Sequence, residues 1–287
     1  MRCAVPFPSP LVLTPLLRQW LLEDIGRGDR TTEALLGDRA RVGVAQLRLK
    51  QSGVVAGLPL IQAVYQLLDP TVTVETMVQE GDEVNAGTTV AQIEAPYGAL
   101  LSGERVFLNL VMWLSGIATL TRRYTAQIAD LPTVLVDTRK TTPGLRLLEK
   151  YATAVGGAQN HRYGLDDAAM IKDNHIAAAG GIEPAIACLR QTLPFPLTIE
   201  VETETLAQVE TAVACGADVI MLDNMPLEQM RTAVAYIRSH NPAIRIEASG
   251  NVTLQTLRAI AETGVDYISS SAPITQATWL DFSLRIS

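Results

Sequence analysis

Charged side chains are scarce in this sequence, and no run of basic residues stands out. Only 18% of the 287 residues are Asp, Glu, Lys or Arg, and the formal net charge at pH 7 is −7. Proteins that bind nucleic acids or anionic membranes usually concentrate Lys and Arg on one face. We therefore expect neither a nucleic acid nor a membrane as a partner. An anionic ligand would have to be held by a few cations inside a pocket.

Cysteine is also rare, and its spacing excludes the usual metal and redox motifs. The three cysteines, Cys3, Cys188 and Cys215, are odd in number and far apart. This pattern predicts a reduced, cytoplasmic protein. The apolar N-terminal stretch is interrupted by prolines at positions 6, 8, 10 and 15, so none of its runs reaches the length of a membrane span. It also lacks the cleavage pattern of a signal peptide.

What the sequence does contain is apolar residues, at 48%, which indicate a well-packed globular protein of one large or two ordinary domains. In the first third, Thr14 is predicted to cap a helix that begins at Pro15. Two segments rich in β-branched residues, 41–57 and 72–96, predict strands, and residues 58–69 between them have helical periodicity. A long apolar helix is then expected over residues 103–130.

The second half repeats a strand followed by a helix, which predicts parallel strands. Five short apolar segments end in polar residues: "TVLVDTRK", "LTIEVETE", "DVIMLDN", "IRIEASGN" and "DYISSSAP". Parallel strands would gather these polar ends on one rim, where β/α barrels carry their chemistry. The segment is too short for eight β/α units, which typically need about 250 residues, so we expect an open barrel. A doubly wound sheet is the alternative, although no glycine-rich dinucleotide loop follows any of these strands.

The expected domains are an N-terminal α/β sandwich over residues 1–118 and an open parallel α/β barrel over residues 119–275. We expect residues 276–287 to return to the first domain.

Three cations are candidates for holding a small dicarboxylate. Arg139 follows a predicted strand, Arg162 follows a Gly-Gly pair, and Lys172 is flanked by apolar residues. Arg fits a planar carboxylate through a bidentate fork, and Lys supplies a point charge. The nearby His161 and His175 are fourteen residues apart and match no usual spacing of metal ligands, so a metal is not expected on them. The better interpretation of His175 is a structural histidine.

Acidic residues form a second candidate group. Glu200, Glu202 and Glu204 alternate along one predicted strand and share a face, and Asp223 ends the next strand. Buried acids need a cation or ligand hydroxyls to satisfy them. Glu202 and Asp223 therefore predict a site for a divalent metal and a sugar diol, and Mg²⁺ is the metal that combines carboxylates with substrate phosphates.

Two small, polar strand ends are candidates for binding phosphate through backbone N–H groups. The first consists of Ser249, Gly250 and Asn251; the second runs from Ser269 to Pro273, and Ser270, Ser271 and Ala272 are its candidate binding residues. Together with the cations and acids they indicate the transfer of a phosphorylated sugar to a small aromatic acid.

Several distinctive blocks are spread along the sequence: "EDIGRGDRTT", "SGERVFLNL", "DTRKTTPGLR", "GGAQNHRYGLDD", "IKDNH", "IMLDN" and "EASGN". Together they resemble the quinolinate phosphoribosyltransferase family over nearly the whole chain. The resemblance implies a reaction that joins quinolinate to phosphoribosyl pyrophosphate with Mg²⁺ and releases pyrophosphate and carbon dioxide. It also implies a homodimer in which one subunit's N-terminal domain closes the partner's active site.

The resemblance also assigns roles to individual residues. Quinolinate would be held by Arg139, His161, Arg162 and Lys172, with Arg105 reaching across from the partner subunit, and Thr138 would also bind substrate. Lys140, Glu202, Asp223 and residues 249–251 would bind the phosphoribosyl donor, and Lys140, Glu202 and Asp223 would be catalytic. The chain departs from the family at residues 270–275, where a glycine and a histidine of the usual run are replaced; we expect the N–H groups of Ser270 and Ser271 to bind phosphate there instead.

Two other functions are considered. Residues 79–96 resemble the hairpin of biotinyl and lipoyl carrier domains, but the turn has no lysine to modify. The second alternative is a paralogue of the same fold that acts on a different acid, such as a molybdenum-transport-associated relative. The presence of Arg139, Arg162 and Lys172 argues against it.

Overall fold

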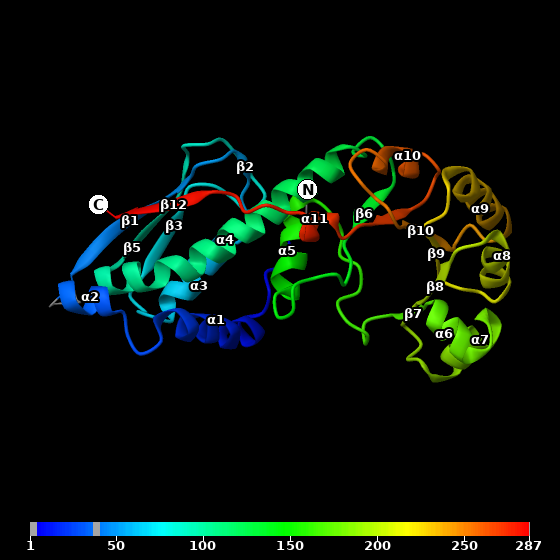
Figure 1. Ribbon diagram of the computed structural model, residues 1–287, viewed down its shortest axis with the longest axis horizontal. Helices are drawn as coiled ribbons and strands as arrows, with labels where there is room; N and C mark the ends of the chain where they lie inside the picture. The colour runs from blue at the N-terminus through cyan, green and yellow to red at the C-terminus, as the bar shows by residue number, and fades with distance from the viewer. Residues whose placement is uncertain (1–4, 37–40, 287) are drawn as a thin grey trace. The chain divides into compact units, whose positions relative to one another are not determined.

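The computed structural model describes residues 5–36 and 41–286, and the chain folds into two units (Figure 1). The first unit takes the described residues up to Arg122, then Leu147–Gly157, and finally the segment from Gln276 onward. The second unit takes Arg123–Arg146 and Ala158–Thr275. Cys3 lies outside the described residues.

The first unit is built on a four-stranded antiparallel sheet in the order β12, β1, β5, β3. These strands are β1 (Val42–Leu49), β3 (Thr73–Thr76), β5 (Thr89–Pro96) and β12 (Phe282–Ile286), and a small pair is formed by β2 (Gly53–Val54) and β4 (Glu83–Val84). In β1 the residues Ala45, Leu47 and Leu49 are fully buried, whereas Arg48 is exposed. This alternation is the period-two pattern of a half-buried strand.

The helices of this unit are α1 (Pro10–Ile25), α2 (Arg30–Leu35), α3 (Leu58–Gln66), α4 (Tyr97–Ala126) and α5 (Arg146–Gly156). The predicted start of α1 is wrong. Ser9, not Thr14, caps the helix by accepting the N–H of Leu11, and Pro10 occupies the first turn. Pro15 lies inside the helix. A proline at the start of a helix lacks only an N–H that has no intrahelical partner, so Pro10 is as compatible with a helix start as Pro15.

Helix α4 is long and apolar enough to cross a membrane on length and composition alone. The same properties suit the central helix of a globular unit, and Leu100, Phe107, Val111 and Leu114 on α4 are all buried. Gly116 on this helix permits a close approach of the C-terminal segment, because a Cβ at this position would lie 2.0 Å from the backbone oxygen of Thr278.

Gly116→Ala is therefore expected to destabilise the protein, although alanine is the better helix former. The added methyl must displace a backbone carbonyl, and overpacking of this kind costs about 2 kcal/mol in the free energy of unfolding. Denaturant unfolding measures the change. Arg123→Ala, at an exposed position of the same helix, is the control and should stay within about 0.5 kcal/mol of wild type. Unchanged or higher stability of Gly116→Ala would contradict the packing.

Helix α5 interrupts the barrel in sequence but packs with the first unit. Its Tyr151 donates a hydrogen bond to Glu80 at 2.6 Å, and its Glu149 accepts one from the indole of Trp113 at 3.0 Å. The boundary expected between residues 118 and 119 assigns this helix to the barrel, so the structural division differs there.

The second unit is an open sheet of six parallel strands in the order β6, β11, β10, β9, β8, β7. They are β6 (Val134–Val136), β7 (Ala169–Ile171), β8 (Ile199–Thr203), β9 (Val219–Asp223), β10 (Arg245–Ser249) and β11 (Tyr267–Ser269). Five of these strands correspond to the segments predicted from the sequence; β7, only three residues long, was not predicted. The parallel, open arrangement and the fold class are confirmed.

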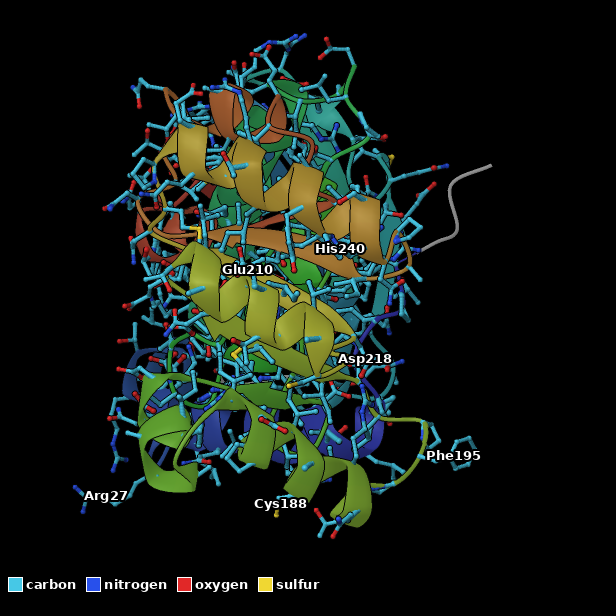
Figure 2. The ribbon with its side chains drawn as sticks, turned by 90° about the vertical axis from the view of Figure 1, so that its right-hand side faces the viewer. Arg27, Cys188, Phe195, Glu210, Asp218 and His240 are labelled. Carbon is cyan, nitrogen blue, oxygen red and sulfur yellow. The ribbon has the colours of Figure 1, made fainter. Side chains whose placement is uncertain are left out.

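The helices that follow the strands are α6 (Asp173–Ala179), α7 (Ile182–Thr192), α8 (Leu206–Ala214), α9 (Leu227–His240), α10 (Leu257–Ala261) and α11 (Ala272–Thr275). Figure 2 shows α7, α8 and α9 side by side on the outer face of the sheet, with Phe195 projecting from the loop after α7. Ile220, Leu222, Val209 and Ile237 are fully buried. The apolar core thus lies between these helices and the outer face of the sheet, and polar side chains can occupy the inner face.

Candidate active site

A cavity of about 540 Å³ lies in the second unit, at the carboxyl ends of the parallel strands. Of the residues proposed from the sequence, it is lined by Thr138, Arg139, Lys140, His161, Arg162, Lys172, Glu202, Asp223, Ser249, Gly250 and Asn251. Each strand end contributes side chains to the cavity, because polar residues either end the apolar strand or follow it directly. Ser270, Ser271 and Ala272 do not line this cavity, but the preceding residue, Ser269, does. Arg105 lies exposed on α4 of the first unit.

The cationic part of the cavity is formed by Arg139 and Arg162. The Nε atom of Arg139 is buried and has no hydrogen-bond partner among the described residues. Arg162 donates to the backbone oxygen of Ala168 at 2.8 Å, and Met170 lies beside its guanidinium. Burial, and then the positive charge of Arg139, lower the pKa of Arg162. Two guanidinium groups held close together, one with an unused donor, are suited to bind a carboxylate.

His161 is held on both sides of its ring. Its Nε2 atom lies 3.2 Å from Glu200 and 3.3 Å from Glu247, while its Nδ1 atom accepts the backbone N–H of Arg162 at 2.8 Å. Burial lowers the pKa of His161, but the two carboxylates outweigh it and raise the pKa. A proton on Nδ1 would face the N–H of Arg162, so we assign the ring proton to Nε2.

The same geometry decides whether His161, Glu200 and Glu247 could hold a metal ion. Their nitrogen and oxygen atoms lie within 4.8 Å of one another, and one oxygen of each glutamate is buried without a partner. A histidine that ligates a metal usually donates its other ring N–H to an acceptor. Nδ1 of His161 instead faces a donor, so the cluster does not fit a metal. Burial raises the pKa of Glu200.

The carboxylates of Glu202 and Asp223 meet the requirements of a hard divalent cation better. Glu202 forms an ion pair with Lys172, and both side chains line the cavity. Asp223, the last residue of β9, accepts a hydrogen bond from Asn224 at 2.7 Å on one oxygen. Glu202 lies on β8 and Asp223 on the neighbouring strand β9. Their oxygen ligands fit Mg²⁺, which binds through one or two carboxylates and substrate phosphates.

The two loops proposed to bind phosphate differ in how their backbone groups are used. Gly250 and Asn251 have positive φ angles of 93° and 52° and line the cavity. In the second loop, the N–H of Ser270 already donates to the backbone oxygen of Val136 at 3.0 Å. The N–H of Ser270 is therefore already used, and phosphate donation from Ser271, which does not line this cavity, stays a prediction.

Sequence reasoning missed several residues of the cavity: Asp137, Met170, Met221, Asn224 and Glu247. Asp137 is buried. Its carboxylate accepts hydrogen bonds from the backbone N–H of His161 at 2.9 Å and from the side-chain amide of Asn160 at 2.7 Å. Glu247 lies two residues before Ser249 on β10 and could have been found by the same alternation that singled out the glutamates of β8.

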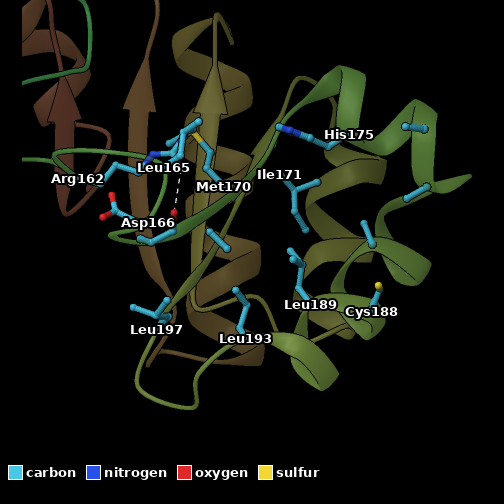
Figure 3. A pocket seen from close by; sticks show the side chains of 15 residues that line it. Arg162, Leu165, Asp166, Met170, Ile171, His175, Cys188, Leu189, Leu193 and Leu197 are labelled. Carbon is cyan, nitrogen blue, oxygen red and sulfur yellow. Dashed lines mark hydrogen bonds between the residues drawn. The ribbon is translucent and has the colours of Figure 1, made fainter.

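A second, mostly apolar cavity of about 600 Å³ lies beside β7 (Figure 3). It is bounded by side chains of β7, α7 and the following loop, such as Ile171, Leu189 and Leu197, and it shares Arg162 with the first cavity. His175 lies at its edge, where its Nδ1 atom accepts the N–H of Lys172 at 3.0 Å. This contact agrees with the structural role expected for His175.

The fold and the cavity define an open α/β barrel protein with a site for an anionic ligand at the carboxyl ends of its strands. Two family models match the chain: "Quinolinate phosphoribosyl transferase, N-terminal domain" over residues 29–115 and "Quinolinate phosphoribosyl transferase, C-terminal domain" over residues 117–285. The chain therefore belongs to the quinolinate phosphoribosyl transferase family.

Full-length relatives and solved structures agree with this membership. The chain is 57% identical to a probable nicotinate-nucleotide pyrophosphorylase (carboxylating) of Synechocystis, covering 100% of this chain and 99% of the relative. A Bacillus subtilis protein with the same description is 45% identical, covering 96% and 94%. The crystal structure of NadC from Streptococcus pyogenes matches with a TM-score of 0.93 and 41% identity, covering 98% of this chain and 99% of that one.

Proposed function

We propose that this protein transfers the phosphoribosyl group of phosphoribosyl pyrophosphate to the ring nitrogen of quinolinate, with decarboxylation, to give nicotinate mononucleotide for NAD biosynthesis. The observation that carries the proposal is that Arg139, Arg162 and Lys172 line one cavity. The carboxylates of Glu202 and Asp223 and the loop of residues 249–251 line the same cavity. The family membership supports the same reaction.

The cationic side chains bind and orient the acid in this proposal. Quinolinate carries two carboxylates on adjacent ring positions, and the unused Nε donor of Arg139 is available to one of them. Arg162 keeps its orientation through the backbone oxygen of Ala168. Lys172, which forms an ion pair with Glu202, would contribute its positive charge to binding of the acid. Fixing the acid in this way lowers the entropic part of the barrier.

Glu202 and Asp223 would hold Mg²⁺ and the ribose hydroxyls, and Lys140 and residues 249–251 would hold the phosphates. When bound, Mg²⁺ supplies positive charge that neutralises the pyrophosphate leaving group. As the bond from C1 of the ribose to pyrophosphate breaks, positive charge develops at C1, and the carboxylates of Glu202 and Asp223 stabilise it electrostatically. The ring nitrogen then forms the new bond to C1.

Decarboxylation follows from the chemistry of the product ring. Once the ring nitrogen is quaternary, its positive charge stabilises the electron pair that stays on the adjacent ring carbon when the carboxylate leaves as carbon dioxide. A proton then replaces the lost group at that carbon. No covalent intermediate with the protein is required, so the side chains act by positioning and by charge.

We also propose a homodimer with shared active sites, in which the exposed Arg105 of one subunit contacts the acid bound to its partner. The exposed position of Arg105 on α4 is compatible with this role. The cytoplasmic location expected from the sequence is likewise a proposal, supported by the free thiols of Cys188 and Cys215.

Incubation of the protein with quinolinate, phosphoribosyl pyrophosphate and Mg²⁺ is expected to release carbon dioxide and the mononucleotide in equal amounts. Nicotinate lacks the second carboxylate, so it should react at least about 10²-fold more slowly in a site built to pair that group. The assay follows labelled carbon dioxide and separates the nucleotide. Turnover of nicotinate without turnover of quinolinate would instead favour a paralogue that acts on a different acid.

A further inference from the structure

Asn224 connects the two rim loops that follow β9 and β10. Asn224 and Asn251 have φ angles of 53° and 52°, and they are the only non-glycine residues with a positive φ among those the structure describes. Side chains with a Cβ disfavour this left-handed conformation, which asparagine tolerates best. Two such residues side by side at a cavity indicate a backbone held for function.

Both polar atoms of the Asn224 side chain form hydrogen bonds. Its Nδ2 atom donates to the Oδ2 atom of Asp223 at 2.7 Å, and its Oδ1 atom accepts from Nδ2 of Asn251 at 3.2 Å. A carboxylate can only accept, so the orientation of the Asn224 amide is fixed by Asp223. The backbone N–H of Asn224 also donates to the oxygen of Ser249 at 2.9 Å.

Gly250 allows the loop after β10 to pack closely against the Asn224 amide. A Cβ at Gly250 would lie 2.1 Å from Oδ1 of Asn224, and the φ angle of Gly250 is 93°. Only glycine permits this approach without strain. The ends of β9 and β10 are therefore joined by side-chain and backbone contacts, in addition to the strand register that pairs Asp223 with Ser249.

We propose that Asn224 is a positioning residue that fixes the Asp223 carboxylate and residues 249–251 as one rigid acceptor for the phosphoribosyl donor. This inference rests on the proposed function, because it takes Asp223 as the metal and ribose ligand and residues 249–251 as the phosphate loop. The amide occupies one oxygen of Asp223 and so directs the other toward a ligand. Loss of the amide would weaken binding of the donor without changing the cations that bind the acid.

Asn224→Gly tests the proposal, because glycine keeps the positive φ angle and removes only the amide. We expect KM for phosphoribosyl pyrophosphate to rise about tenfold, which corresponds to the loss of one charge-assisted hydrogen bond. KM for quinolinate should change by less than about twofold, and the thermal midpoint should be close to wild type. Asn224→Asp should weaken donor binding at least as much, because it places a second carboxylate beside Asp223.

Two further variants separate this role from a general loss of structure. Asn241→Gly, an exposed asparagine at the end of α9, is the matched control and should leave both KM values unchanged. Asn251→Gly removes the other half of the amide contact. The double variant Asn224→Gly with Asn251→Gly should lose less affinity for the donor than the sum of the single variants, as expected for groups that share one contact.

Binding of magnesium pyrophosphate, measured by calorimetry, makes the test independent of turnover. Wild type that binds magnesium pyrophosphate but does not turn over quinolinate would reject the proposed function, and weaker binding by Asn224→Gly would still support the role of Asn224. Active wild type with unchanged donor binding in Asn224→Gly would overturn the inference. Equal increases in both KM values would also overturn it, because they would show a general loss of the site.

Discussion

Arg139→Ala is expected to lower kcat/KM for quinolinate by about 10²–10³-fold, the effect of removing one partner from a buried charged pair. The reason is the guanidinium of Arg139, whose buried Nε atom has no hydrogen-bond partner among the described residues. A bound carboxylate would satisfy this donor. Steady-state kinetics with each substrate varied in turn should place most of the loss in KM for quinolinate, with KM for phosphoribosyl pyrophosphate much less affected.

Two variants sharpen this prediction. Arg139→Lys keeps the charge but not the planar fork, so it should recover only part of the loss. Arg258→Ala is the control, because Arg258 forms an exposed bidentate pair with Asp130 on the same unit. Exposed pairs contribute about 0–1 kcal/mol, so activity should be unchanged. If Arg139→Ala bound quinolinate as well as wild type does, the assignment of Arg139 would be wrong.

The placement of Arg139, Lys172, Glu202 and Asp223 on one cavity follows directly from their positions at strand ends. A short apolar strand in a parallel sheet buries its middle residues and exposes its carboxyl end on a common rim. Composition and strand-helix alternation therefore predicted both the open barrel and most of the rim. The missed strand β7 reads Ala-Met-Ile, with one β-branched residue, whereas the predicted strand β6 of the same length reads Val-Leu-Val.

Other features depend on three-dimensional contacts that no local pattern contains. The role of His161 in holding the acid stays a prediction, and its two ring nitrogens contact Glu200, Glu247 and the backbone N–H of Arg162. The contact with Glu247 joins positions far apart in sequence. Helix α5 joins the first unit through Tyr151 and Glu80 for the same reason. Local sequence signals existed for Glu247, through strand alternation, and for Asn224, since asparagine after a strand-end acid tolerates a positive φ angle.

A mixture of two inactive variants is expected to regain activity if active sites are shared between subunits. Arg105→Ala should be nearly inactive, because the acid would lose a cation supplied by the partner. Lys172→Ala should also be nearly inactive, because it removes a cation of the cavity in the second unit. Arg105 lies in the first unit, so the two changes affect different parts of the chain.

The amount of recovered activity follows from the symmetry of a dimer. When equal amounts of the two variants exchange subunits at random, half of the dimers contain one subunit of each variant. Each of these mixed dimers has one intact site and one site that carries both changes. About a quarter of wild-type activity is therefore expected. Exchange is verified with two differently tagged subunits, and mixing two copies of the same variant is the control. If tagged subunits exchange and activity stays at the level of the single variants, Arg105 does not act in the partner's site. The acid would then have to be bound without a cation from the partner.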